Sequence, residues 1–170
     1  MSESERSSAS ELTCARMLDT PWFQAAQVIM LYAPTEYELD VTLLARECER
    51  TGRRVVVPQT NWEEKSLQPA LVDRWDGPWD VTRYGIRQPP TSATAVATYQ
   101  IDLVVVPGLA FDRHRMRLGR GAGLYDRFLG QADVRAAKIG IGFDWQLLPE
   151  IPVFDHDQRL DGIVVESEVI

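Results

Sequence analysis

The chain has 170 residues, of which 45% are hydrophobic and 25% are charged, so we expect one compact domain over residues 1–170. Its formal net charge of -7 argues against a nucleic-acid partner, because such proteins need clustered Lys and Arg to displace counterions from phosphates. An anionic ligand must therefore meet a local basic site.

The cysteines and the N-terminal segment indicate where the protein works. Cys14 and Cys48 lie far apart and outside any metal-ligand spacing, which favours a reduced interior over a disulfide framework. Residues 1–9 are polar and rich in Ser and Glu, so we expect a disordered terminus and no signal peptide or membrane segment. The sequence therefore predicts a cytoplasmic protein without a membrane partner.

Short apolar runs alternate with helically spaced segments in the first part of the chain. Ser10 is a good N-cap, because its hydroxyl can accept hydrogen bonds from the free amides of a first helical turn. Gly52 follows a helically spaced run and favours a C-terminal cap. These signals predict a helix at 10–19, a buried strand at 28–32, a helix at 41–51 and a buried strand at 55–58.

The segment 60–98 is irregular, with four prolines and three tryptophans, which predicts loops and short antiparallel strands. The remaining pattern predicts an α/β fold, in which a mostly parallel sheet is flanked by helices in three layers and the irregular segment forms a small antiparallel insertion. Ligands of such sheets bind beyond the carboxyl ends of the strands. The later elements are predicted as a strand at 101–106, a helix at 124–131 and strands at 138–143 and 162–166.

A glycine-rich segment precedes the predicted helix at 124–131. Gly119, Gly121 and Gly123 would let backbone amides approach a phosphate, and the helix start adds partial positive charge. Arg117 and Arg120 could supply bidentate guanidinium donors. The spacing matches neither the dinucleotide fingerprint nor a P-loop. From the glycines alone, a tight turn without a ligand stays open as the simpler interpretation.

The residues around these glycines resemble a known family. VPGLAFD at 106–112 and RLGRGAGLYDRFL at 117–129 are similar to the signature of the 5-formyltetrahydrofolate cyclo-ligase family. Further similarity follows in the family's order and extends from about residue 10 to residue 166, at 32–40, 84–89, 138–143 and 151–161. The resemblance implies closure of 5-formyltetrahydrofolate to 5,10-methenyltetrahydrofolate, with Mg²⁺ as cofactor and ATP hydrolysed to ADP and phosphate.

The resemblance also implies how the reaction runs and which residues hold ATP. The γ-phosphoryl group passes to the formyl oxygen, N10 attacks the activated carbon, and phosphate leaves. Arg117, Arg120 and Tyr125 take the catalytic roles. The implied ATP-binding residues are Arg117, Leu118, Gly119, Arg120, Gly121, Ala122, Gly123, Leu124 and Tyr125.

Folate and metal residues follow from the same resemblance. Asp126 and Asp157 match metal-binding carboxylates of the family. From residue type alone, Asp126 would be an acid in a first helical turn, favoured by the helix dipole, and Asp157 a solvated acid in a turn. Without the resemblance, Glu38 would be a solvated loop acid, and Tyr84 and Tyr125 would be ordinary half-buried core aromatics. His114 and His156 have no metal-ligand spacing and no role, and we expect His114 on an exposed loop. The implied folate-binding residues are Glu38, Tyr84, Arg120, Leu124 and Tyr125.

The sequence also departs from the family pattern. The family's additional N-terminal helix carries a Lys and an Arg for the ATP phosphates, whereas the first twenty residues here contain no Lys. Ala122 stands where the family has Gly or Lys, and Leu124 where Tyr is common. Weaker nucleotide binding is therefore expected.

Three hypotheses stay open. In the first, the chain is an active cyclo-ligase in which Arg6, Arg16 or a partner chain replaces the missing cation. In the second, it is a non-catalytic relative that binds folate or nucleotide, and in the third the start of the chain is misassigned. The expected ligands are ATP and 5-formyltetrahydrofolate, with or without a polyglutamate tail, and the expected assembly is a monomer or a weak dimer.

Overall fold

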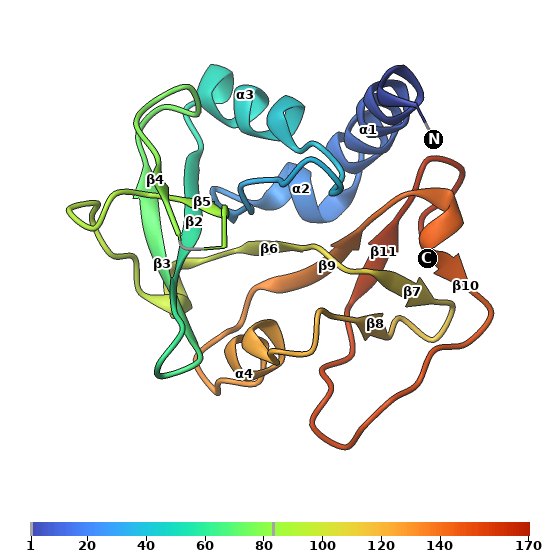
Figure 1. Ribbon diagram of the computed structural model, residues 1–170. Coiled ribbons are helices and arrows are strands. Elements are labelled where there is room, and N and C mark those ends of the chain that lie inside the picture. The colour runs from blue at the N-terminus through green and yellow to red at the C-terminus, as the bar shows by residue number, and fades with distance from the viewer. Residues whose placement is uncertain (1, 83) are drawn as a thin grey trace.

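The residues described by this computed structural model, 2–82 and 84–170, form a six-stranded central sheet (Figure 1). The strand order is β11-β9-β6-β1-β2-β3, and β3 is antiparallel to β2 whereas the other neighbours are parallel. The predicted mostly parallel α/β sheet is confirmed. Its strands are β1 (Val28–Met30), β2 (Arg54–Asn61), β3 (Ser66–Val72), β6 (Leu103–Val106), β9 (Ala137–Ile141) and β11 (Gly162–Val164).

Alternate side chains of the central strands enter two separate hydrophobic cores. Ile29 and Val105 belong to the core beneath the N-terminal helices, whereas Met30 and Val104 belong to the core on the opposite face. Burial on both faces explains why β1 and β6 are continuous apolar runs and not alternating ones.

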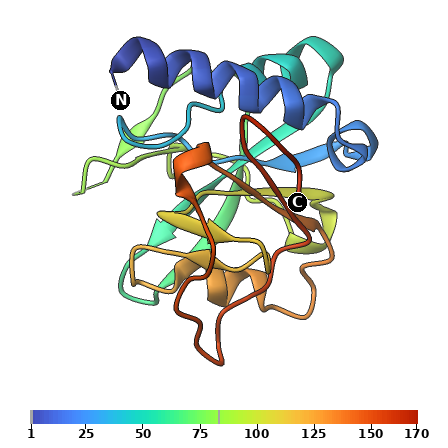
Figure 2. The same ribbon diagram turned by 90° about the vertical axis from the view of Figure 1, so that its right-hand side faces the viewer.

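Helices cover both faces of the sheet, as the side view in Figure 2 shows. Helices α1, α2 and α3 lie on one face and the short α4 lies on the other (Figure 1). Gly52 ends α3 with a left-handed φ of 72°, which confirms the predicted cap. The helices are α1 (Glu3–Leu18), α2 (Pro21–Ala25), α3 (Thr42–Thr51) and α4 (Leu124–Leu129), and the single 3₁₀ turns are η1 (Thr98–Gln100) and η2 (Asp144–Gln146).

The prediction of a disordered terminus and a helix start at Ser10 is wrong. Helix α1 begins at Glu3, because Ser2 and Glu5 form a capping box in which the Glu5 amide donates to Ser2 Oγ at 3.3 Å and the Ser2 amide donates to Glu5 Oε2 at 2.6 Å. Ser10 is buried inside this helix and accepts a hydrogen bond from the Asp40 amide at 3.1 Å. The end of the helix near Asp19 is confirmed.

The irregular segment contains short antiparallel strands, as predicted. β3 pairs with β2 along its whole length, from Val55 opposite Val72 to Asn61 opposite Ser66, so β2 extends beyond the predicted strand. β4 (Asp80–Val81) and β5 (Arg87–Gln88) form a separate small hairpin.

A second sheet of three short strands was not predicted. It consists of β7 (Ala110–Asp112), β8 (Arg117–Leu118) and β10 (Leu147–Leu148), in the order β10-β7-β8. The buried Asp112 shapes the turn between the first two, because its Oδ1 accepts the amides of His114 and Met116 at 2.9 and 3.0 Å. Arg117 therefore begins its segment on a strand and not in a loop. His114 is exposed on that turn, as expected.

Candidate functional site

A cavity of about 400 Å³ lies beyond the carboxyl ends of the central strands, where ligands of parallel sheets bind. Tyr32 and Ala33 follow β1 into its wall, and Pro107 and Gly108 follow β6. The rest of the lining comes from the loop after β1, the β2–β3 and β4–β5 hairpins, the glycine-rich segment and the loop before β11. Segments that are far apart in the sequence thus meet at one place.

The glycine-rich segment forms one wall of this cavity. Every predicted ATP-binding residue from 117 to 125 lines it, as does Asp126. Gly121 and Gly123 have left-handed φ values of 87° and 65°, which residues with side chains rarely adopt. Gly119 is needed for space, because a Cβ at this position would lie 2.9 Å from Nη1 of Arg117. The turn therefore brings its backbone close to any ligand.

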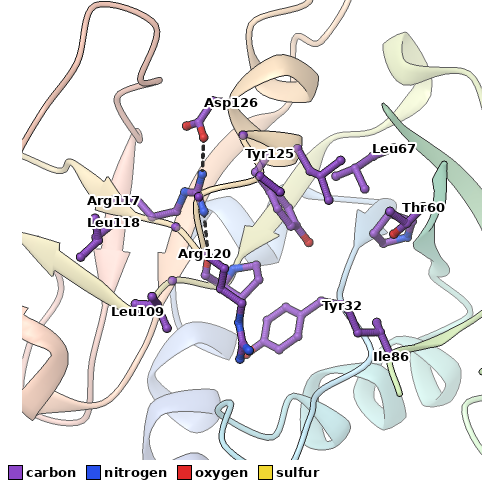
Figure 3. Close-up of a pocket in the computed structure, with 18 of the residues that line it drawn as sticks. Tyr32, Thr60, Leu67, Ile86, Leu109, Arg117, Leu118, Arg120, Tyr125 and Asp126 are labelled. Atoms are coloured by element: carbon purple, nitrogen blue, oxygen red, sulfur yellow. Dashed lines mark hydrogen bonds and ion pairs between the residues drawn. The ribbon is translucent and has the colours of Figure 1, made fainter. Parts of the chain in front are cut away.

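Arg117 and Asp126 form a buried ion pair on this wall (Figure 3). Nη2 of Arg117 donates to Oδ2 of Asp126 at 2.8 Å, and the two side chains are only 6% and 12% exposed. Nη1 donates to the carbonyl of Pro107 at 3.4 Å, whereas the buried Nε finds no hydrogen-bond partner among the described residues. Arg117 therefore retains donor capacity.

Two tyrosines reach the same cavity from opposite sides (Figure 3). Burial raises the pKa of the Tyr125 phenol, and Glu38 adds to the rise, whereas the nearby Arg117 opposes it. Burial likewise raises the pKa of Tyr32 well above its ordinary value, and its hydroxyl donates to the carbonyl of Leu39 at 2.7 Å. Both phenols are therefore neutral at physiological pH, and Tyr125 suits hydrogen bonding better than base catalysis.

A second and weaker ion pair joins Arg120 to Glu38. Nη2 of Arg120 lies 3.4 Å from Oε1 of Glu38, and the arginine side chain is 57% exposed. The other carboxylate oxygen of Glu38 accepts the Thr35 amide at 2.9 Å. The residue predicted to hold folate therefore contacts a residue predicted to hold phosphate.

The two predicted metal ligands line the same cavity. Oδ1 of Asp126 accepts the Gln158 amide at 3.5 Å, and Oδ2 of Asp157 accepts the Phe154 amide at 2.8 Å. No group of three or more His, Cys, Asp and Glu residues that could hold a metal occurs within the described ranges. Two carboxylates fit a Mg²⁺ ion that completes its shell with phosphate oxygens and water. Asp126 would have to leave Arg117 or share its oxygens.

Tyr84, predicted to bind folate, lies beside the cavity and not in its lining. It is outside the set of described residues that line the cavity, 56% of it is exposed, and its ring packs edge-on against Trp62 with 4.6 Å between the centroids. The other predicted folate residues, at 38, 120, 124 and 125, do line the cavity. Tyr84 thus supports Trp62, which lines the wall itself.

Sequence reasoning missed several residues of the cavity. Trp62, Arg87 and Phe154 all line it, and His156, which had been given no role, lies on the same wall. The bulky Trp62 in an irregular segment was the available signal. Nε and Nη2 of Arg16 donate to the carbonyl oxygen of Glu166 at 3.1 and 2.8 Å. Neither Arg16 nor Arg6 is among the described residues that line the cavity.

Comparisons with known proteins agree with this geometry. The model of the 5-formyltetrahydrofolate cyclo-ligase family matches residues 1–166. A 5-formyltetrahydrofolate cyclo-ligase of Mycolicibacterium smegmatis is 33% identical over 151 residues, which cover 86% of this chain and 77% of that protein. A probable 5-formyltetrahydrofolate cyclo-ligase of Caenorhabditis elegans is 26% identical over 180 residues, with 100% and 87% covered.

Solved structures show the same fold. The NMR structure of Aquifex aeolicus 5,10-methenyltetrahydrofolate synthetase superposes with a TM-score of 0.84 at 30% identity, covering 99% of this chain and 84% of that one. A 5,10-methenyltetrahydrofolate synthetase from Mycoplasma pneumoniae gives a TM-score of 0.78 at 22% identity, covering 98% and 90%. The chain belongs to the 5-formyltetrahydrofolate cyclo-ligase family.

Proposed function

We propose that the chain closes 5-formyltetrahydrofolate to 5,10-methenyltetrahydrofolate and hydrolyses ATP to ADP and phosphate in doing so. Family membership supports this activity, and one observation carries it. The whole segment 117–126, with two arginines, three glycines and a carboxylate, lines a single cavity together with Glu38 and Asp157.

The triphosphate is placed against the glycine-rich wall. Its oxygens would accept hydrogen bonds from the amides of residues 119–123 and from the guanidinium groups of Arg117 and Arg120. Arg87 of β5 also lines the cavity and is a further cation for the phosphates, so the proposal requires no N-terminal lysine. We therefore propose that residues of the cavity itself stabilise the negative charge on the transferring phosphoryl group.

The folate ring is placed against the apolar wall opposite. Tyr32, Trp62, Leu67 and Ile86 line that side, and flat heterocycles gain contact area and stacking against such side chains. Glu38 is the carboxylate available to accept hydrogen bonds from pterin nitrogens, once Arg120 turns to phosphate. The formyl group then lies between the folate and phosphate walls.

Asp126 and Asp157 would hold Mg²⁺. When bound, the ion neutralises charge on the β- and γ-phosphates. The protein's own part is to hold the formyl oxygen in line with the γ-phosphorus. Arg117 and Arg120 stabilise negative charge on the equatorial oxygens, and the neutral Tyr125 hydroxyl donates a hydrogen bond. Transfer of the γ-phosphoryl group to the formyl oxygen releases ADP, N10 then attacks the activated formyl carbon and loses its proton, and the phosphorylated oxygen leaves as phosphate when the ring closes.

The alternative is a relative that binds folate or nucleotide without turnover, and Ala122 and Leu124 favour it because both lie on the cavity wall. The test is the absorbance of methenyltetrahydrofolate formed from 5-formyltetrahydrofolate with ATP and Mg²⁺. We expect turnover that requires both additions. A well-folded protein that binds ADP but gives no product above background would establish the binding-only alternative.

We also propose a cytoplasmic location and a monomeric or weakly dimeric state. Both cysteines are free and buried thiols, which suits a reducing compartment. No helix within the described residues is long and apolar enough to span a membrane. Sedimentation at several protein concentrations tests the assembly, and a stable higher oligomer would contradict it.

A further inference from the structure

We propose that the Arg117–Asp126 ion pair makes the cavity select metal-complexed nucleotide over free nucleotide. This inference rests on the proposed function, because it concerns how the same cavity discriminates between two forms of its nucleotide. The observation behind it is that the main phosphate-binding cation and a proposed metal ligand already neutralise each other, at 2.8 Å.

Neither member of the pair can be left alone without cost. Removing one partner from a buried ion pair leaves an uncompensated charge away from water, which is strongly destabilising. Free nucleotide would draw the Arg117 donors toward its phosphates and leave the Asp126 carboxylate, 12% exposed, without its cation. A metal ion alone would take Asp126 and leave the guanidinium, 6% exposed, without its anion.

A nucleotide that carries its metal supplies both replacements at once. The phosphates satisfy the guanidinium and the ion satisfies the carboxylate, so the two buried charges exchange partners and neither is abandoned. The unpartnered Nε of Arg117 can take part in the new arrangement without breaking an existing bond. The pair therefore penalises each component alone but not the complex.

Packing prevents Arg117 from escaping this choice by turning away. Arg117 packs closely against the backbone of Gly119 and Gly108, because a Cβ added at these glycines would lie 2.9 Å from its Nη1 and 3.0 Å from its Cγ. The Tyr125 ring centre lies 5.5 Å from its Cζ. The arginine is thus enclosed on several sides.

Arg120 imposes no comparable selection. Its guanidinium is 57% exposed and only 3.4 Å from Glu38, so water can hydrate the arginine when the contact opens, and the 19% exposed Glu38 keeps the hydrogen bond from the Thr35 amide. The discrimination is therefore assigned to the buried pair alone.

The test is calorimetric titration of the full chain with ADP, either with Mg²⁺ or with EDTA. In the parent protein, ADP should bind at least about tenfold more tightly with Mg²⁺. In Asp126→Asn, where Arg117 no longer has a carboxylate to abandon, metal-free ADP should bind about tenfold more tightly than in the parent, and Mg²⁺ should add little. If Asp126 were a metal ligand that did not restrain Arg117, Asp126→Asn would not increase the affinity for metal-free ADP.

Asp157→Asn is the matched control, because it removes the same charge from the same cavity without releasing an arginine. Its metal-free affinity for ADP should change no more than about twofold. An equal gain in both variants would reduce the effect to general electrostatics and overturn the proposal. So would the absence of any gain in a folded Asp126→Asn protein.

Arg117→Gln provides the reciprocal measurement if Asp126→Asn does not fold. Binding of Mn²⁺ alone, followed by electron paramagnetic resonance, should be about tenfold tighter than in the parent, because Asp126 is then free. Unchanged Mn²⁺ affinity would overturn the proposal. If the folded parent binds no ADP with or without Mg²⁺, the proposed function itself is wrong, and that result is distinct from normal Mg²⁺-ADP binding without the variant effects.

Discussion

The two arginines of the glycine-rich segment are three positions apart but belong to different regions of the molecule. Arg117 begins on strand β8, is 6% exposed and pairs with Asp126 at 2.8 Å, whereas Arg120 lies in the loop, is 57% exposed and meets Glu38 at 3.4 Å. Burial raises the cost of separating a pair, and exposure lowers it. One motif therefore contains a buried cation and an exposed one.

The largest expected effect is that of Arg117→Ala. It leaves Asp126 buried without its cation, which typically costs about 3–5 kcal/mol of stability. Urea denaturation followed by circular dichroism measures this cost, and turnover should be lost as well. A destabilisation below about 1 kcal/mol would place the pair in the class of surface ion pairs.

A smaller effect, with a change of sign, is expected for Gly119→Ala. The added Cβ would lie 2.9 Å from Nη1 of Arg117, and overpacking of this kind costs about 1–3 kcal/mol. In an Arg117→Ala background the obstructing atoms are gone, so the same change should be neutral or stabilising, because alanine restricts the unfolded chain. Equal costs in both backgrounds would show that Gly119 is needed for another reason.

Alkaline pH should lower the free energy of unfolding through the buried phenol of Tyr125. Burial raises the pKa of this phenol above its ordinary value of 10.0, so above pH 10 the unfolded chain releases the proton while the folded chain keeps it. Stability contributed by this group is therefore complete below pH 10 and declines as the pH rises further. Urea midpoints across this range should fall less steeply for Tyr125→Phe than for the parent, and the exposed Tyr99→Phe serves as the control.

The smallest change in stability is expected for Arg120→Ala. An exposed pair contributes at most about 1 kcal/mol, so the denaturation midpoint should stay close to that of the parent. The affinity for ADP should nevertheless fall, because the substitution removes a phosphate-binding cation. A large loss of stability here would erase the distinction between the two arginines.

Much of the fold follows from local sequence signals. The central strands are short continuous apolar runs, and Gly52 marks a helix end as glycine commonly does. Strands β7, β8 and β10 were not predicted, because strands of two or three residues show no hydrophobic periodicity. The start of α1 escaped because its polar first turns resemble a disordered tail, and its stability comes from the Ser2–Glu5 capping box and packing against α3.

The candidate site was predictable where it lies in one segment. Residues 117–126 line the cavity because a single turn carries them all, whereas Tyr84 required knowledge of how the irregular segment folds. Trp62 takes the wall position, and the Tyr84 ring packs edge-on against it. The pairing of Arg117 with Asp126 was also out of reach, since sequence shows charges but not which of them share a buried space.

The scattered origin of the cavity lining has a practical consequence. Residues from the loop after β1, the β2–β3 hairpin, the turn after β6, the glycine-rich segment and the loop before β11 must all be in place before the cavity exists. A compound that fits the cavity therefore binds the folded chain and not the unfolded one. It stabilises the fold by RT ln(1 + [L]/Kd), about 2.7 kcal/mol at a hundredfold excess over Kd, and so raises the melting temperature. Thermal shift can thus rank folates and nucleotides as ligands, separately or together, before any product is measured.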